Sequence, residues 1–147
     1  MSEKARLTIV IVSYNTREMT LDCLTSIYAE TRETPFHVVV LDNMSNDGSP
    51  DAIAEAFPQA QLIRSPKNLG FARGNNAAVS QTESELVLLL NPDTVVLDGA
   101  IDTLVAFAND NPRAMIWGGR TLFGDRTLNP SSCWRRMTVW NLFCRST

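Results

Sequence analysis

Apolar residues along this chain gather in short runs that are separated by polar clusters. The run Leu86–Leu90 consists of five consecutive apolar residues. Such a run leaves no polar face and predicts a strand that is buried on both sides, as in a parallel sheet. Pro92 has no N–H group for a strand ladder, so the strand is expected to end before it. Asp93 then follows the carboxyl end of the strand, which is the edge where open α/β sheets bind their ligands.

Other apolar runs predict further strands, and segments with helical spacing lie between them. The strands are expected at 7–12, 36–41, 61–64 and 114–117. The helices are expected after Thr16, from Ser49 with Pro50 at the first helical position, after a polar loop at 68–76, and between Asp98 and Asn111. Thr16 and Asp98 are the expected caps of their helices, and Gly124 and Asp125 are the expected turn of a hairpin. This alternation predicts an α/β fold with a Rossmann-like, mostly parallel sheet flanked by helices.

Composition narrows the class of protein. Hydrophobic residues make up 44% of the chain and charged residues 20%, as in ordinary globular proteins. A net charge of -3 and a pI near 5.1 argue against nucleic-acid binding. No apolar run approaches the roughly 18 residues that cross a bilayer, and the first residues lack the apolar core of a signal peptide. We therefore expect a cytoplasmic protein.

The three cysteines, Cys23, Cys133 and Cys144, are widely spaced and form no CxxC pair. An odd number at such spacing predicts free thiols in a reducing compartment, rather than disulfides or a zinc site.

Polar side chains follow three of the predicted strands, in the segments 13–15, 42–43 and 91–93. Because the carboxyl ends of parallel strands meet at one edge, these segments are expected to share a crevice. Asp42 can accept a hydrogen bond from a base or a ribose hydroxyl, and Tyr14 offers a ring face. Asp93 is a ligand of the kind that Mg²⁺ or Mn²⁺ prefers. These groups indicate a metal-bridged nucleotide, while the role of each Asp as a helix or turn cap stays an alternative.

Phosphate-binding loops of known spacing are not supported. The segment Gly70–Gly74 matches neither GxGxxG nor GxxxxGK[ST]. Its glycines are expected to allow close approach of the backbone to a ligand, or to cap a helix.

Taken together, these segments resemble the family 2 glycosyltransferases, particularly their rhamnosyltransferase-like branch. The resemblance covers about residues 7–119 and rests on four segments in order, which are 10–15, 39–48, 68–76 and 88–94. It implies the A-type glycosyltransferase fold, in which a Rossmann-like nucleotide-binding half is joined to an acceptor-binding half. It also implies a nucleoside-diphosphate sugar donor, such as a UDP or dTDP sugar, and a divalent metal, Mg²⁺ or Mn²⁺.

The resemblance assigns roles residue by residue. Asp42 would hydrogen-bond the base of the nucleotide, and Asp93 would bind the metal as the last residue of the DxD motif. Asn91 stands at the first position of that motif and could accept a hydrogen bond from a sugar hydroxyl without adding charge. The other implied substrate-binding residues line the nucleoside pocket or the loop that closes over the ligand: Ser13, Tyr14, Asn15, Asn43, Ser45, Asn68, Gly70, Phe71 and Asn75.

One departure from the family concerns the catalytic base. Relatives continue into a segment whose carboxylate pair deprotonates the acceptor hydroxyl during inverting transfer. After Asp125 this sequence contains no Asp or Glu, so no catalytic residue is assigned. We expect a nucleotide-sugar-binding domain at 1–119, followed at 120–147 by a hairpin and the start of a truncated acceptor-binding part.

Two functions remain open from sequence alone. The first is inverting sugar transfer from the nucleotide sugar to a glycan or lipid-linked acceptor, in cell-surface polysaccharide synthesis. The second is a non-catalytic nucleotide-sugar-binding or interaction module. The aromatic and cationic residues of the tail predict either the beginning of the acceptor half, with self-association through its apolar groups, or a helix at the inner membrane surface. They are Trp134, Arg135, Arg136, Trp140, Phe143 and Arg145.

Overall fold

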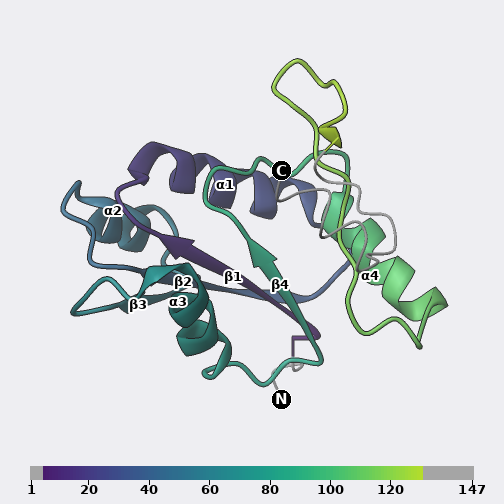
Figure 1. Ribbon diagram of the computed structural model, residues 1–147, viewed down its shortest axis with the longest axis horizontal. Helices are drawn as coiled ribbons and strands as arrows, with labels where there is room; N and C mark the ends of the chain where they lie inside the picture. The colour runs from purple at the N-terminus through teal and green to yellow at the C-terminus, as the bar shows by residue number, and fades with distance from the viewer. Residues whose placement is uncertain (1–4, 131–147) are drawn as a thin grey trace, which may run out of the picture. The chain divides into compact units, whose positions relative to one another are not determined.

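The computed structural model describes residues 5–130, in which strands and helices alternate as predicted (Figure 1). The elements are β1 (Leu7–Ser13), α1 (Arg17–Glu30), β2 (Phe36–Asp42), α2 (Ser49–Ala56), β3 (Gln61–Arg64), α3 (Gly70–Val79), β4 (Leu86–Leu90) and α4 (Ala100–Asp110). The chain forms two compact units that divide between Phe107 and Ala108. The predicted domains at 1–119 and 120–147 stay a prediction. No helix within residues 5–130 is long and apolar enough to cross a membrane.

The four strands form one parallel sheet in the order β3-β2-β1-β4. β1 lies in the interior of this sheet, and every one of its residues is buried. Its run of β-branched residues suits a strand that packs on both faces. Ser13 at the end of β1 pairs with Asp42 at the end of β2, so the polar ends of these strands lie side by side. The predicted Rossmann-like parallel sheet is confirmed.

Helices cover both faces of the sheet (Figure 1). On one face, α1, α2 and α4 supply Leu24, Ile27, Ile53 and Ile101 to a core with alternate residues of β1 and β2. On the other face, α3 packs on the remaining residues of the same strands, including Val10, Val39 and Leu41. Because side chains alternate across a strand, the two continuous apolar strands serve both cores.

Close packing of α3 on the sheet depends on Gly74. A Cβ atom at this position would lie 3.0 Å from Val12 Cγ1, 3.3 Å from Val12 Cγ2 and 3.7 Å from Leu41 Cδ2. The missing side chain therefore lets the helix backbone approach β1 and β2 directly.

The predicted burial of β4 on both faces is wrong. Leu86, Leu88 and Leu90 are partly buried against the core shared with α1, but Val87 and Leu89 on the opposite face are 41% and 51% exposed. β4 is the last strand of the described sheet, and α3 packs over β1 and β2 instead. An apolar run shows which side chains a strand could bury, but they are buried only where another element packs against them.

The predicted strand at 114–117 is also wrong. Residues 114–117 have no strand structure, and Met115 and Ile116 are 87% and 93% exposed. An apolar run of this length becomes a strand only where another strand pairs with it. The predicted turn at Gly124 and Asp125 is confirmed, because the N–H of Arg126 donates to the carbonyl of Phe123 at 2.8 Å. The flanking chain forms a single antiparallel bridge between Leu122 and Leu128.

The starts of two helices and the cap of a third differ from their predictions. Thr16 stands before α1, but its hydroxyl makes no capping hydrogen bond. α3 begins at Gly70, within the predicted polar loop, because Asn68 Oδ1 accepts the N–H of Gly70 at 2.8 Å and starts the turn. α4 begins at Ala100, so the residue before it is Gly99, with a φ of 64°, rather than Asp98.

Asp102 of α4 holds the connection between α1 and β2. Its carboxylate accepts the N–H groups of Arg32 and Thr34 at 2.9 Å each and that of Glu33 at 3.3 Å. Partial burial raises the pKa of this carboxyl, but the hydrogen bonds from Arg32, Thr34 and Glu33 lower it more, so the net pKa lies below its ordinary value. The folded state therefore favours the ionised form of Asp102.

Gly74→Val is expected to lower the free energy of unfolding by about 1–3 kcal/mol, because its side chain would clash with Val12. Urea denaturation followed by circular dichroism measures this loss. Gly118→Val is the matched control, since within the described part of the chain no atom beyond its two neighbours lies within 4 Å of a Cβ built on Gly118. An equal loss in the two variants would contradict the close packing of α3.

Asp102→Ala is expected to lose about 1–3 kcal/mol at neutral pH through the loss of charged hydrogen bonds. Because the folded-state pKa is lowered, the contribution of Asp102 is present above its unfolded pKa and disappears as pH falls through the folded value. Urea midpoints of the wild type and the variant should therefore converge in acid. Asp22→Ala on the exposed side of α1 is the control and should keep the wild-type urea midpoint at neutral pH.

Candidate functional site

The carboxyl edge of the sheet brings the first two predicted polar segments together. The N–H of Asn43 donates to the carbonyl of Ser13 at 2.8 Å, directly beyond the paired ends of β1 and β2. The N–H of Ser65 donates to the carbonyl of Asp42 at 2.9 Å, which adds the end of β3. The segment 91–93 follows β4, which pairs with the other side of β1. The three segments thus follow adjacent parallel strands at one edge, as predicted.

Asp42 has a buried acceptor atom that a ligand could satisfy. The side chain is only 3% exposed. Its Oδ2 atom accepts the N–H of Ser45 at 3.1 Å, while its Oδ1 atom is buried and has no hydrogen-bond partner among residues 5–130. A buried carboxylate oxygen without a partner is unfavourable in free energy, and a donor on a bound molecule would remove that penalty.

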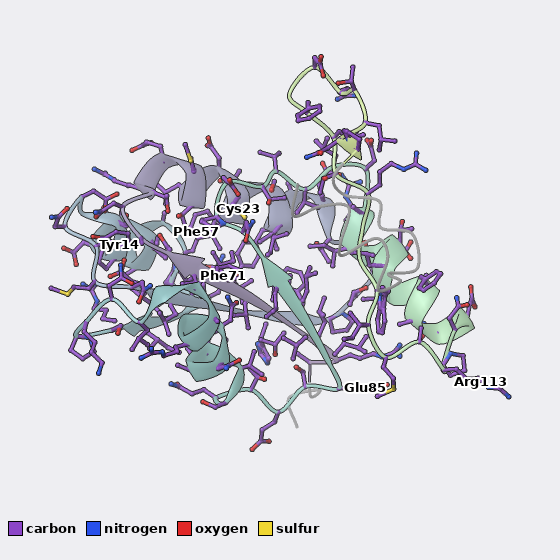
Figure 2. The ribbon with its side chains drawn as sticks, in the orientation of Figure 1. Tyr14, Cys23, Phe57, Phe71, Glu85 and Arg113 are labelled. Carbon is purple, nitrogen blue, oxygen red and sulfur yellow. The ribbon has the colours of Figure 1, made fainter. Side chains whose placement is uncertain are left out.

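Two aromatic side chains at this edge face solvent. Tyr14 follows β1 and is 48% exposed, and Phe71 lies in the first turn of α3 and is 63% exposed (Figure 2). Exposed rings of this kind offer flat apolar surface to a planar ligand. Met44, in the loop that follows β2, has a φ of 70°. This left-handed conformation is unfavourable for a residue with a side chain.

The amides of Asn43 and Asn68 join the end of β2 to the start of α3. Asn43 Nδ2 donates to Asn68 Oδ1 at 2.9 Å, and Asn43 Oδ1 accepts the N–H of Leu69 at 2.7 Å. The same Asn68 oxygen accepts the N–H of Gly70. Asn75, further along α3, is buried and donates to the carbonyl of Phe71 at 2.9 Å. These amides hold the loop and the helix in place, and their predicted contacts with substrate stay predictions.

Three hydrogen bonds, here named the loop clasp, join the β1–α1 loop to the β2–α2 loop. The N–H of Asn15 donates to Ser45 Oγ at 2.9 Å, and the N–H of Asn46 donates to Asn15 Oδ1 at 2.9 Å. The N–H of Arg17 donates to Asp47 Oδ2 at 3.0 Å. The clasp ties together loops whose residues lie 30 or 31 positions apart in sequence.

Asp47 is a residue that the sequence analysis did not single out. Besides the N–H of Arg17, it accepts the N–H of Ser49 at 3.0 Å and the hydroxyl of Ser49, both at Oδ1. The Ser49 hydroxyl lowers the pKa of Asp47 most; slight burial raises it, and the N–H groups of Ser49 and Arg17 lower it further. A signal was present, since an Asp two residues before a Ser that starts a helix is typical of an Asx turn.

Ser13, which was predicted to line the nucleoside pocket, is fully buried. Its hydroxyl lies 3.1 Å from the hydroxyls of both Thr16 and Thr20, and the hydroxyl of Thr20 donates to the carbonyl of Thr16. The side chain therefore ties the end of β1 to the first turn of α1, beneath the exposed residues Tyr14 and Asn15.

The segment after β4 presents its polar side chains to solvent. Asn91 and Asp93 are both exposed, and α1 holds the backbone on either side of Asp93. Cys23 Sγ lies 3.7 Å from the carbonyl oxygen of Asn91, and Ser26 Oγ accepts the N–H of Val96 at 2.9 Å. Burial, and then the negative charge of Asp93, raise the pKa of Cys23 to about 12, which shows that this carboxylate lies near α1.

Asp93 suits a metal ion whose other ligands are substrate phosphates and waters rather than further side chains of the protein. Among residues 5–130 no group of three or more His, Cys, Asp or Glu side chains could hold a metal ion. Mg²⁺ commonly takes one or two carboxylates and several waters, together with phosphates of the substrate. An exposed Asp93 with the amide of Asn91 two residues before it fits that donor set.

Three comparisons place this chain among known proteins. The family model described as "Glycosyl transferase family 2" matches residues 8–146. The chain is 29% identical over 137 residues to N-acetylglucosaminyl-diphospho-decaprenol L-rhamnosyltransferase of Mycobacterium tuberculosis, a match that covers 86% of this chain and 44% of the relative.

Among solved structures, the chain is similar to the mannosyltransferase PcManGT from Pyrobaculum calidifontis in complex with GDP-Man and Mn2+. The TM-score is 0.64 at 27% identity, over 73% of this chain and 33% of that one. S. aureus TarS 1-349 in complex with UDP has a TM-score of 0.65 at 22% identity, over 73% of this chain and 33% of that one, and shows the same fold. The chain spans less than half the length of each of these proteins.

Cys23 is expected to be unreactive in the folded protein, because it is fully buried and its pKa is raised to about 12. At pH 8 only roughly one thiol in ten thousand would be ionised, and the thiolate is the reactive form. The test uses a chain in which Cys133 and Cys144, which lie outside the described residues, are replaced by Ser. Ellman's reagent should then detect no thiol in buffer and one in denaturant; full reaction within minutes in buffer would contradict the prediction.

Proposed function

Since the chain belongs to glycosyl transferase family 2, we propose that its sheet edge binds the nucleoside diphosphate of a sugar donor, such as a UDP or dTDP sugar. The complete enzyme would transfer the sugar with inversion to a glycan or lipid-linked acceptor in cell-surface polysaccharide synthesis. The relative that is named for a diphospho-decaprenol acceptor supports the lipid-linked choice. An enzyme that acts on such an acceptor would work in the cytoplasm, at the inner face of the membrane.

The observation that carries this proposal is the unpartnered Oδ1 atom of Asp42. An N–H group on the edge of a base, or a ribose hydroxyl, is the donor that this acceptor lacks. Tyr14 and Phe71 add exposed ring surface from the neighbouring loop and helix. A nucleoside supplies a donor edge and a flat face in one molecule, which a simple sugar does not.

Asp93 would hold the divalent metal, and Asn91 would accept a hydrogen bond from a hydroxyl of the ribose or sugar. A bound Mg²⁺ or Mn²⁺ would neutralise charge on the diphosphate leaving group. The Mn2+ in the complex of the mannosyltransferase from P. calidifontis supports this choice of cofactor. The carboxylate of Asp93 would keep the diphosphate end of the donor at the carboxyl edge of β4.

No described residue is assigned as the catalytic base. Asp125, the last carboxylate of the sequence, lies in the hairpin turn and accepts the hydroxyl and the N–H of Thr127 at 2.6 and 2.9 Å. The Thr127 hydroxyl, followed by its N–H, lowers the pKa of Asp125, which makes it a weaker base. This observation supports the second candidate function for the isolated chain, which is a binding module that holds the nucleotide sugar without transferring it.

UDP, dTDP or GDP with Mn²⁺ is expected to raise the melting temperature of the chain. At one hundred times Kd the gain is about 2.7 kcal/mol, or roughly 5–10 °C for a chain of this size. Asp93→Ala should remove the metal-dependent part of the shift, and Asp42→Asn should weaken binding at least about tenfold, because an amide N–H₂ would replace one acceptor. Differential scanning fluorimetry and calorimetric titration measure the two effects.

Asp51→Asn is the matched control, since Asp51 is an exposed residue of α2 whose partner is Arg64 at 2.8 Å. It should keep the full shift. The absence of stabilisation by all three nucleotides, with and without metal, would reject the proposed donor site. A single-turnover assay for sugar transfer to an acceptor then separates the enzyme from the binding module, because the module gives none.

A further inference from the structure

We propose that Asp47 is the positioning residue of this site, whose carboxylate holds the β1–α1 loop and the β2–α2 loop in one arrangement before the ligand arrives. The consequence for ligand binding rests on the proposed function. The arrangement of the loops themselves does not, because all the contacts that carry it lie within the chain.

Asp47 takes the place of two missing helix caps. Neither Thr16 before α1 nor Gly48 before α2 makes a side-chain capping hydrogen bond. Asp47 instead accepts the N–H of the first residue of each helix, which are Arg17 and Ser49. Helix N-termini carry unpaired N–H groups and partial positive charge, so one carboxylate between two of them is favourable.

The position of Asp47 couples the helices to the binding edge. The chain passes from β1 through Tyr14 and Asn15 to the start of α1, and from β2 through Asp42 and Met44 to Asp47. The remaining bonds of the loop clasp, those of Asn15 with Ser45 and Asn46, lie along these same two segments. Strand pairing already holds Asp42 beside Ser13. Asp47 adds to this by holding the starts of α1 and α2, and with them the loop segments that contain Tyr14 and Met44.

The backbone of the β2–α2 loop requires such support. Met44 has a φ of 70° and Gly48 a φ of 79°. The left-handed conformation of Met44 is unfavourable for a residue with a side chain and persists only where surrounding contacts impose it. Ser45 donates its N–H to Asp42 immediately after this residue. Release of Asp47 would remove one of the contacts that hold this loop and would let Met44 relax.

Asp47 differs from Asp42 in what its carboxylate has left to offer. Both oxygen atoms of Asp47 accept hydrogen bonds from the protein, at Oδ1 from Ser49 and at Oδ2 from Arg17. Asp42 keeps one buried oxygen without a partner. Asp47 therefore acts on a ligand through the loops, whereas Asp42 contacts the ligand itself.

The experiment compares wild type, Asp47→Asn and Asp47→Ala at a temperature where all three are folded. The amide of Asp47→Asn keeps one oxygen acceptor and so can hold only one of the two helix starts. Calorimetric titration should show nucleoside-diphosphate affinity reduced about tenfold or more in both variants. Hydrogen exchange of the nucleotide-free chain should show faster exchange of the Asn15 and Asn46 amides, whose partners are not Asp47.

Two controls separate positioning from loss of stability or charge. Ile53→Val removes a buried methyl group of α2, which lowers the melting temperature, and should leave nucleotide affinity and clasp exchange unchanged. Asp51→Asn removes one negative charge from the same helix and should also leave nucleotide affinity and clasp exchange unchanged.

Wild-type affinity and wild-type protection of Asn15 and Asn46 in Asp47→Asn would overturn the proposal. If neither variant folds, exchange of the wild type decides, since the amides of Asn15, Arg17 and Asn46 should open together; unprotected exchange of Asn15 and Asn46 would overturn the proposal. A wild-type chain that binds no nucleotide rejects the proposed function, while the exchange data still judge the role of Asp47.

Discussion

Parallel pairing of β1 with both β2 and β4 is the constraint on which the rest of this structure depends. It places the carboxyl ends of adjacent strands at one edge, although the segments that follow them lie tens of residues apart in sequence. Helices on both faces leave β1 without a solvent-facing side, so a mostly apolar strand is the stable choice. Apart from Thr8, whose hydroxyl accepts a hydrogen bond from that of Ser84 at 2.7 Å, polar groups begin where this strand ends. Ser13 marks that point, and its hydroxyl is at once engaged by Thr16 and Thr20.

At the carboxyl edge, most polar side chains are occupied by the protein itself. Asn43 and Asn68 join β2 to α3, while Asn15, Ser45 and Asp47 join the two neighbouring loops. A side chain that satisfies a backbone N–H lowers the free energy of the folded loop whether or not a ligand is present. The buried Oδ1 of Asp42 does not, and only an external donor can satisfy it. Most of these residues therefore hold the loops in position, whereas Asp42 has an acceptor left that a ligand could use.

The sequence predicted the main elements because their signals are local. The apolar runs of β1 and β2 and the Ser49-Pro50 helix start were found within a residue of their observed positions. The second face of β4 was misjudged, because the cover of Val87 and Leu89 depends on where α3 packs and not on their own run. The segment at 114–117 failed for the same reason, since strand formation requires a partner. The loop clasp was also beyond prediction, because its bonds join residues about 30 positions apart.

The arrangement of charge at this edge bears on how it would treat a diphosphate. Asp42 and Asp93 are both carboxylates, and a nucleoside diphosphate brings further negative charge. Asp42 is buried and has one unpaired oxygen, so a neutral donor on a base or ribose would meet it without repulsion. Asp93 is exposed at the end of a different strand, where a divalent cation can lie between carboxylate and phosphate. Such a cation converts the repulsion into attraction, whereas an uncharged Asn91 beside it adds none of the repulsion that a second carboxylate would bring. Substitution of Asn91 by Asp would therefore strengthen metal binding while making the metal-free site less tolerant of the diphosphate.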